Sequence, residues 1–152
     1  MKPFYLRPMK KEDISEVHAL AFNCLDEYFS KDVFSLFLQQ WPNGQHVACR
    51  YDGEIVGFIC GSDLGPDRVG ISLFGVVKEF RGMGIGSRLL SVLRYNGILR
   101  GARTMRLEVR KENRTAIDFY EKRGFTVTEV LESYYSNGGD AIRMMGLCVT
   151  DS

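Results

Sequence analysis

Residues 69–93 read VGISLFGVVKEFRGMGIGSRLLSVL. The apolar run at residues 69–77 predicts a buried strand. A glycine-rich loop follows at residues 81–87, and the chain continues with apolar residues such as Ile85 and Leu89 at helical spacing. A strand that leads through glycines directly into a helix is typical of α/β proteins.

Strand patterns lie on both sides of this stretch. Residues 104–109 alternate apolar and polar, and a strand–helix–strand unit needs a right-handed crossover, so this strand and residues 69–77 are predicted to be parallel neighbours. Upstream, residues 46–51 and 54–61 flank Asp52-Gly53, the commonest two-residue hairpin turn. These two strands and residues 69–77 therefore predict an antiparallel meander.

The remaining elements complete one domain, residues 1–152. Further strands are predicted at residues 4–7, 125–131 and 141–149. Asp13 and Asn113 are each predicted to cap a helix, the second of which ends at Gly124, and another helical stretch includes residues 33–38. Gly97 and Gly101 are predicted to mark the fraying end of the helix that starts near Ile85. The predicted fold class is α/β: a mixed, mostly antiparallel central sheet of about seven strands with helices on both faces.

Composition narrows the class of function. The 152 residues include 20 Lys and Arg against 19 Asp and Glu, a formal net charge of +1, which gives no global field for nucleic acid or anionic lipid. No apolar run reaches the ~20 residues of a membrane helix. The chain has four cysteines, none in a CxxC pair, and two histidines, which are too few suitably spaced ligands to predict a zinc site. We therefore expect a cytoplasmic protein with reduced cysteines, no metal, no nucleic-acid partner and no membrane partner.

The glycine loop predicts a phosphate ligand. Glycines let a ligand approach the backbone, and the start of a helix offers unpaired N–H groups and partial positive charge. The loop has no lysine of a P-loop, and Leu89 stands where a dinucleotide fingerprint starting at Gly84 requires glycine or alanine. The loop therefore matches neither of these two nucleotide-binding patterns, and a plain strand-to-helix turn is the alternative to a phosphate site.

A longer stretch of sequence around the glycine loop resembles a known protein family. Arg81-x-x-Gly84-x-Gly86 after the strand, and the segment from Leu107 to Phe125, resemble the GNAT superfamily of acetyl-CoA-dependent N-acetyltransferases. The segment from Tyr134-Tyr135 to Asp140-Ala141 resembles the ending of the protein N-terminal acetyltransferases, which include RimI and the catalytic subunit of NatA.

The resemblance implies acetyl-CoA as co-substrate and no metal. It places the pyrophosphate of coenzyme A on the N–H groups of the glycine loop and the pantetheine arm along the preceding strand, with two further contacts beyond residue 110. The implied cofactor-binding residues are Phe74, Gly75, Val76, Arg81, Gly82, Met83, Gly84, Ile85, Gly86, Ser87, Asn113 and Tyr120. The basic run Arg110-Lys111 with Arg114 is expected to attract the 3′-phosphate.

The resemblance also implies a transfer chemistry. Glu108 matches the family's glutamate and is expected to act as a water-mediated general base, with a solvated strand glutamate as the alternative. Tyr120 is the expected general acid, with a core aromatic as the alternative. Glu27, Tyr28, Tyr134 and Tyr135 are the expected substrate-binding residues, and an ordinary turn is the alternative for the tyrosine pair.

The resulting hypothesis is acetylation of protein or peptide N-termini. Alternatives are a GNAT acetyltransferase for a lysine side chain or small amine, and a non-catalytic acyl-CoA-binding domain. Whether a partner subunit or a homodimer is involved is left open.

Overall fold

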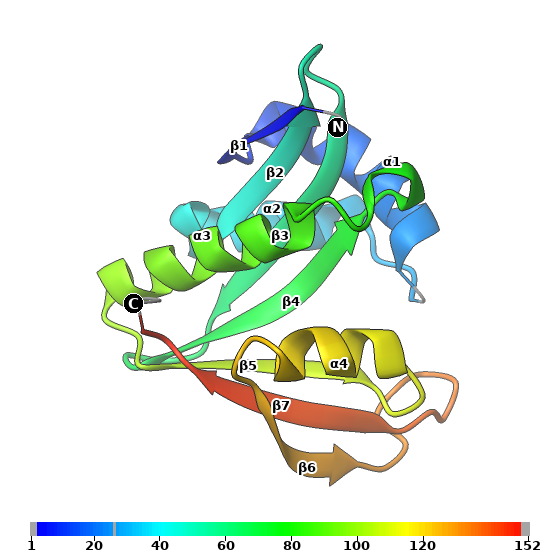
Figure 1. The fold of residues 1–152 in the computed structure, drawn as a ribbon, viewed down its shortest axis with the longest axis vertical. Coiled ribbons are helices and arrows are strands. Elements are labelled where there is room, and N and C mark those ends of the chain that lie inside the picture. The colour runs from blue at the N-terminus through cyan, green and yellow to red at the C-terminus, as the bar shows by residue number, and fades with distance from the viewer. Residues whose placement is uncertain (1–2, 26, 150–152) are drawn as a thin grey trace.

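A seven-stranded sheet runs through the molecule in the order β1-β2-β3-β4-β5-β7-β6 (Figure 1). The structure is a computed structural model and describes residues 3–25 and 27–149. The strands are β1 (Phe4–Pro8), β2 (Gln45–Arg50), β3 (Ile55–Asp63), β4 (Arg68–Val76), β5 (Thr104–Arg110), β6 (Thr126–Leu131) and β7 (Ala141–Leu147). The α-helices are α1 (Ile14–Cys24), α2 (Lys31–Gln40), α3 (Ile85–Arg100) and α4 (Arg114–Glu121). Single 3₁₀ turns lie at Lys11–Asp13, Pro42–Gly44 and Lys78–Phe80.

Strand pairing divides the sheet into two parts. Strands β1 to β4 pair antiparallel, as do β5, β7 and β6. The parts join through the parallel pair β4–β5, whose register covers only Arg68–Gly70 opposite Thr104–Arg106. Beyond Gly70 the two strands diverge, as Figure 1 shows. The predicted meander and parallel neighbours are confirmed, and the short pairing opens a gap in the middle of the sheet.

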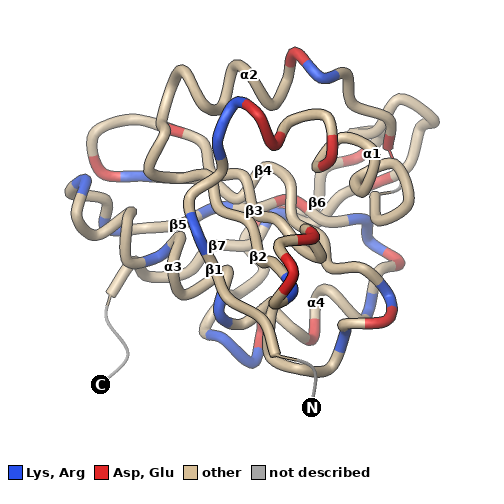
Figure 2. The backbone as a smooth tube through the Cα atoms, turned by 90° about the horizontal axis from the view of Figure 1, so that it is seen from above, with Lys and Arg blue, Asp and Glu red and all other residues tan. Residues whose placement is uncertain are grey.

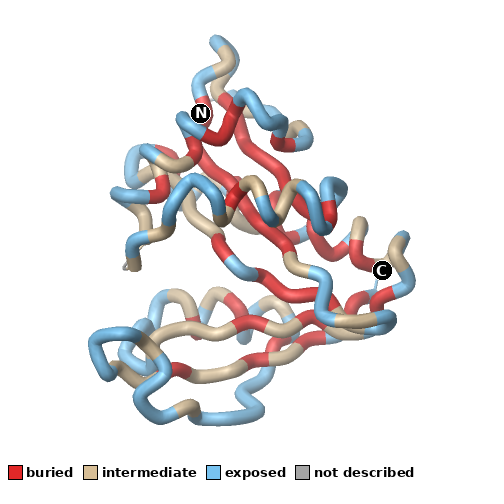
Figure 3. Tube along the Cα trace, turned by 180° about the vertical axis from the view of Figure 1, so that it is seen from behind, coloured by how far each residue is buried: buried red, intermediate tan, exposed pale blue. Residues whose placement is uncertain are grey.

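Helices lie on both faces, as predicted. On one face α1 and α2 cover β2 and β3, with Val17, Phe34 and Phe58 among the fully buried side chains. On the other face α3 and α4 form a second core with the sheet, which includes Leu93 and Ile117. Burial is concentrated in the strands of the first part of the sheet and thins out toward β6 (Figure 3).

Two local predictions are wrong. Gly97 lies inside α3, where its missing side chain makes room for Cys148 Sγ, 2.8 Å from the position that a Cβ would take; the helix ends at Gly101, in the left-handed conformation. Asp13 precedes α1 but does not cap it, because its carboxylate accepts hydrogen bonds from Arg7 and from the backbone N–H of Lys10. In both cases a tertiary contact, with Cys148 for Gly97 and with Arg7 for Asp13, overrides the role that the local sequence predicted.

The cysteines are unpaired, and charges of both signs are spread over the molecule. All four cysteines are free thiols; Cys49, Cys60 and Cys148 are buried and Cys24 is partly exposed. Basic and acidic residues intermingle around the backbone (Figure 2). Across residues 3–25 and 27–149, the helices are too short or too polar to span a membrane, and no cluster of three or more His, Cys, Asp or Glu side chains is arranged to hold a metal ion.

Candidate active site

A cleft of about 520 Å³ opens where β4 and β5 separate. Five segments line it: the end of α1 with the loop that follows, β4, β5, α4 and the β6–β7 loop. The lining residues are Cys24, Leu25, Glu27, Phe29, Ile71, Ser72, Leu73, Phe74, Leu107, Glu108, Val109, Arg110, Asn113, Ala116, Tyr120, Tyr134, Tyr135 and Ser136. Of the predicted site residues, the cleft brings together Glu27, Phe74, Glu108, Asn113, Tyr120, Tyr134 and Tyr135.

The glycine loop lies between β4 and the start of α3. Gly82 and Gly84 have φ angles of 80° and 87°, a region that favours glycine, and no atom lies within 4 Å of the position of an added Cβ at either. Ile85 begins α3 with its side chain buried, so its backbone N–H is the group that can meet a ligand. The loop therefore has the open backbone and helix N-terminus that a pyrophosphate needs.

Side chains around the loop make protein contacts of their own. The Nε of Arg81 donates to the carbonyl oxygen of Val76 at 2.9 Å, which ties the loop to the end of β4. Ser87 accepts hydrogen bonds from Arg123, whose guanidinium lies 3.7 Å from the centre of the Phe119 ring. Met83 is partly buried against the core, and Gly86 has Phe119 and Phe74 at 3.5 Å from the position of an added Cβ. Arg81 and Ser87 thus hold the loop in place.

The edge of β4 that faces the cleft is available for pairing. Backbone groups point alternately to the two edges of a strand, and the N–H of Val77 donates to Val56 on β3. Val76 and Phe74 therefore direct their backbone groups toward the cleft, whereas Gly75 directs its own toward β3. An extended pantetheine arm fits this edge through Phe74 and Val76, with the carbonyl of Val76 already bound by Arg81.

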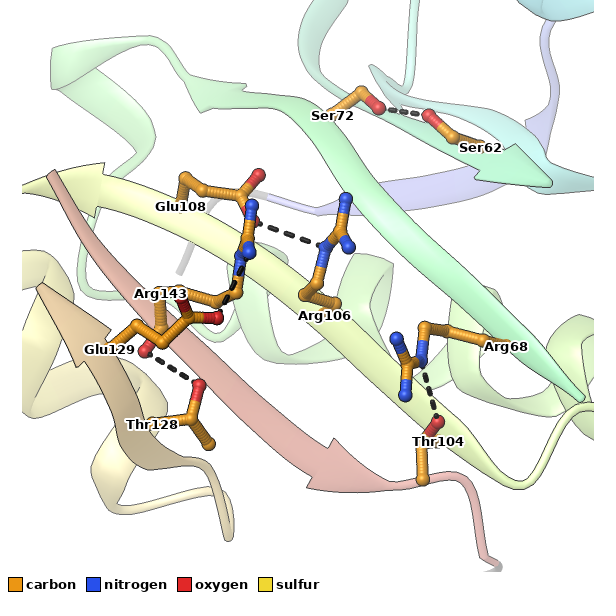
Figure 4. Close-up of polar contacts among 9 residues, drawn as sticks. All are labelled: Ser62, Arg68, Ser72, Thr104, Arg106, Glu108, Thr128, Glu129 and Arg143. Carbon is orange, nitrogen blue, oxygen red and sulfur yellow. Dashed lines mark hydrogen bonds and ion pairs between the residues drawn. The ribbon is translucent and has the colours of Figure 1, made fainter. Parts of the chain in front are cut away.

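Glu108 projects from β5 on the face opposite α4. Its neighbours Leu107 and Met105 are buried in the α3 and α4 core, and alternation along a strand turns Glu108 the other way. Its Oε2 lies 2.8 Å from Nε of Arg143 on β7 and 3.2 Å from Nε of Arg106 (Figure 4). The side chain is 18% exposed, so this carboxylate is held by two cations at the cleft wall rather than freely solvated.

Tyr120 and Asn113 reach the cleft from the other face of the sheet. Burial raises the pKa of the Tyr120 phenol, and its ring packs on Phe119 and Phe125 at centroid distances of 5.3 and 5.5 Å. Asn113 Oδ1 accepts a hydrogen bond from the N–H of Ala116 at 3.1 Å and caps α4, as predicted. Tyr120 is thus a core aromatic that also lines the cleft.

An ion pair between Glu27 and Arg110 forms part of the cleft lining. Glu27, in the α1–α2 loop, accepts a hydrogen bond from Arg110 of β5 at 2.7 Å and one from Ser136 of the β6–β7 loop at 3.2 Å. The Arg110 guanidinium lies 4.2 Å from the centre of the Tyr135 ring. Burial raises the pKa of Tyr135 to about 12, and Tyr134 packs edge-on against it at 5.1 Å. Residues far apart in sequence thus form one polar rim.

Three predicted residues have other surroundings than the rest. Tyr28 is 69% exposed and lines a separate small hollow beside His18, so it is not part of the main cleft lining. Arg110 lies at the rim, with Glu27 and Tyr135 as partners. Arg114, which was grouped with Arg110, pairs with Asp118 at 2.8 Å on the exposed face of α4.

Sequence reasoning did not connect Arg110 with the rim and missed several other lining residues. Arg110 shares its strand face with Glu108 because side chains alternate along a strand, so this alternation was a signal for its position. The apolar lining from Leu25 and Phe29 had no such signal, because these residues come from an irregular loop whose position depends on packing. Ser72 is likewise set in the cleft only by the divergence of β4 and β5.

Comparisons with known proteins agree with this geometry. The model of the acetyltransferase (GNAT) family matches residues 13–125, well over half of the chain. N-alpha-acetyltransferase 30 of Schizosaccharomyces pombe is 36% identical over 143 residues, covering 90% of this chain and 93% of that protein.

Solved structures agree as well. The crystal structure of Ard1 from Thermoplasma volcanium superposes with a TM-score of 0.92 at 33% identity, covering 97% of this chain and 99% of that one. A chain of the NatC complex bound to Gag peptide and CoA superposes with a TM-score of 0.89 at 25% identity, covering 99% of this chain and 100% of that one. The chain therefore belongs to the acetyltransferase (GNAT) family and is an acetyl-CoA-dependent N-acetyltransferase.

Proposed function

We propose that this enzyme acetylates the N-terminal α-amine of proteins or peptides. The observation that carries the proposal is the two-sided cleft. The glycine loop and Tyr120 approach the gap between β4 and β5 from the α3 and α4 side, whereas Glu108, Arg110 and Tyr135 approach it from the opposite side. A thioester and a chain end can therefore enter from opposite faces and meet where β4 and β5 part.

Two relatives support a peptide as the acceptor. One is an N-alpha-acetyltransferase by name, and the other is a complex crystallised with a peptide and CoA. In this chain, the Tyr134–Tyr135 pair and the polar rim at Glu27 offer phenol and carboxylate groups to the first peptide units of a substrate. Partner subunits, known for the NatC relative by its description as a complex, are part of the same proposal.

The chemistry needs only a modest base. An α-amine has a pKa near 8 and a lysine amine near 10.4, so at pH 7 about a tenth of α-amines are neutral against a few in ten thousand lysines. Acetyl-CoA supplies an acetyl thioester. Glu108 takes the proton that the attacking amine loses, through a water molecule, as the new C–N bond forms and the C–S bond breaks.

Tyr120 is proposed to donate its phenol proton toward the departing sulfur. Burial raises the pKa of Tyr120, which keeps the phenol protonated at neutral pH but also makes it a weaker acid. We therefore expect its contribution near the lower end of the ~10²–10⁴-fold range of general acid–base catalysis. The tyrosine then regains a proton from solvent.

The test is acetyl transfer to one lysine-containing peptide, offered with a free and with a blocked N-terminus and read by mass spectrometry. The proposal expects one acetyl group on the first residue of the free peptide and none on the blocked one. Labelling of lysine in both peptides would replace the proposal with a lysine acetyltransferase. Reaction with neither peptide, while a small amine is acetylated, would also overturn it.

Variants test the assigned roles. Glu108→Gln should lower kcat by ~10²–10⁴-fold, and Tyr120→Phe should lower kcat more than it raises KM. Glu121→Gln, an exposed glutamate on α4, is the matched control and should leave both constants unchanged. If Glu108→Gln turns over like the parent enzyme from pH 6 to 9, Glu108 is not the base.

A further inference from the structure

A chain of ion pairs crosses the uncovered face of β5, β7 and β6. Glu108 on β5 lies directly opposite Arg143 on β7, and Arg143 lies opposite Glu129 on β6. Arg143 donates from Nε to Glu108 at 2.8 Å and from Nη1 to Glu129 at 3.0 Å. Figure 4 shows the three side chains in line across the strands, with Arg106 beside Glu108. Arg143 therefore binds two carboxylates, that of Glu108 toward the cleft and that of Glu129 toward the sheet edge.

The two arginines contact the same atom of Glu108. Both Arg143 Nε and Arg106 Nε lie against Oε2. Within residues 3–25 and 27–149, no hydrogen bond or ion pair reaches Oε1. That oxygen points away from both guanidinium groups in Figure 4, and Glu108 lines the cleft. Oε2 of Glu108 is thus held by the two arginines, whereas Oε1 is available to a ligand in the cleft.

We propose that Arg143 is a positioning residue for catalysis, which holds Glu108 through Oε2 so that Oε1 faces the acceptor amine or its bridging water. The proposal rests on the proposed function, in which Glu108 is the base. A glutamate side chain on a strand has several accessible rotamers, and fixing the reactive oxygen in advance removes that entropy from the barrier.

The burial of the pair separates it from an ordinary surface ion pair. The side chains of Arg143 and Glu108 are 21% and 18% exposed, whereas that of the outer partner Glu129 is 52% exposed. Exposed pairs contribute little, and partly desolvated ones are coupled more strongly. The hydrogen bond that Arg143 donates to Glu108 raises the pKa of Arg143, so Arg143 stays cationic throughout the working pH range.

Several charged or titratable groups surround Glu108. They are Arg106 on β5, Arg143 on β7 and, in the cleft lining, Cys24 at the end of α1, Tyr120 on α4, Arg110 and Glu27 at the rim, and Tyr134 and Tyr135 in the β6–β7 loop. Of these, Arg106 and Arg143 contact Glu108 directly. Removing Arg143 therefore leaves one direct cation in place, and the expected effect is moderate.

The first experiment compares Arg143→Met and Arg143→Lys by kcat and KM for a free N-terminal peptide. Arg143→Met should lower kcat about tenfold with little change in KM, because the side chain of Glu108 is no longer fixed in one orientation. Arg143→Lys keeps a positive charge without the planar fork, so kcat should stay below that of the parent. Arg50→Met, which breaks the ion pairs of Arg50 with Asp52 and Glu54 at the β2–β3 hairpin and outside the cleft lining, is the matched control and should change neither constant.

The second experiment is a double-mutant cycle with Glu108→Gln. If Arg143 acts through Glu108, Arg143→Met should have no further effect on kcat in the Glu108→Gln enzyme. An equal loss in both backgrounds would overturn the positioning role while leaving Glu108 as the base. A parent-like kcat of Glu108→Gln would instead remove the base from the proposed function. Thermal unfolding of each variant identifies loss of fold. If Arg143→Met unfolds, Arg143→Lys keeps the test decisive, because a parent-like kcat in a folded Arg143→Lys enzyme would contradict the proposal.

Discussion

The two parts of the sheet are covered differently. Strands β1 to β4 lie between α1 and α2 on one face and α3 on the other, and β3 is buried along most of its length. Strands β5, β7 and β6 have α4 on one face, and β6 is exposed at five of its six residues. A strand buried on both faces has no place for charge, whereas a strand covered on one face presents every second side chain to solvent.

The difference agrees with the site that we propose. In that proposal, the doubly covered part provides the edge of β4 and the start of α3 for the cofactor. The singly covered part provides Glu108, Arg110 and Arg143 on its uncovered face. The cleft forms where the two parts separate, and residues of both parts line it.

Substitution of either of two adjacent core residues on β3 should give the largest loss of stability. Phe58 and Ile59 are both fully buried, and they point to opposite faces. Phe58→Ala is expected to cost about 3–5 kcal/mol and Ile59→Ala about 2–5 kcal/mol in free energy of unfolding, measured by urea denaturation. If one of the two costs less than about 1 kcal/mol, β3 is not covered on both faces as described.

An acid-sensitive ion pair stabilises the doubly covered part. Arg7 and the Lys10 N–H hold the pKa of Asp13 below its ordinary value of 3.8. The stabilisation is therefore fully present above that value and is lost as pH falls through the lower folded pKa. Asp13→Asn should cost about 1.5–3 kcal/mol at pH 7 and flatten the acid limb of stability against pH.

The measurement for Asp13 is urea denaturation across pH 2 to 7. Asp52→Asn, on an exposed ion pair at 3.4 Å, is the control and should leave the curve close to that of the parent. A parallel downward shift of the Asp13→Asn curve, with its acid limb unchanged, would exclude Asp13 as the source of the pH dependence.

The rim joins the two parts across the cleft, and its loss should affect substrate more than fold. Arg110→Met removes the partner of Glu27 and the cation over Tyr135. We expect KM for a peptide to rise about 10- to 100-fold with a small change in melting temperature, because loops that are misplaced by an ångström lose binding geometry. An unchanged peptide KM would show that the rim is only structural. Arg50→Met again serves as the control.

The smallest effect is expected on β6. Val127 is 45% exposed on this edge strand, and Val127→Ala should change the free energy of unfolding by no more than about 0.5 kcal/mol. The measurement is the same urea titration. A cost comparable to that of Phe58→Ala would mean that another surface covers β6 in solution.

Sequence patterns predicted the elements well where local and tertiary preferences agree. The Asn113 cap, the strand–loop–helix at residues 69–93 and the hairpin between β2 and β3 are where they were expected. The hairpin loop has three residues, 51–53, in place of the expected two, because the N–H of Arg50 donates to the carbonyl of Glu54 and Gly53 alone of the three has a positive φ. Gly97 and Asp13 were misjudged because each has a tertiary partner, Cys148 for one and Arg7 for the other, that no local rule contains.

The sequence by itself determined the family, the order of elements, the glycine loop and the alternation that puts Glu108 on a polar strand face, because these depend on residue types at short spacing. The tertiary structure alone decided the length of the β4–β5 pairing, the ion pairs that anchor Glu108, and the contact of Glu27 with Arg110 across 83 positions of sequence. Long-range contacts of this kind depend on how whole layers pack, and no short pattern encodes them.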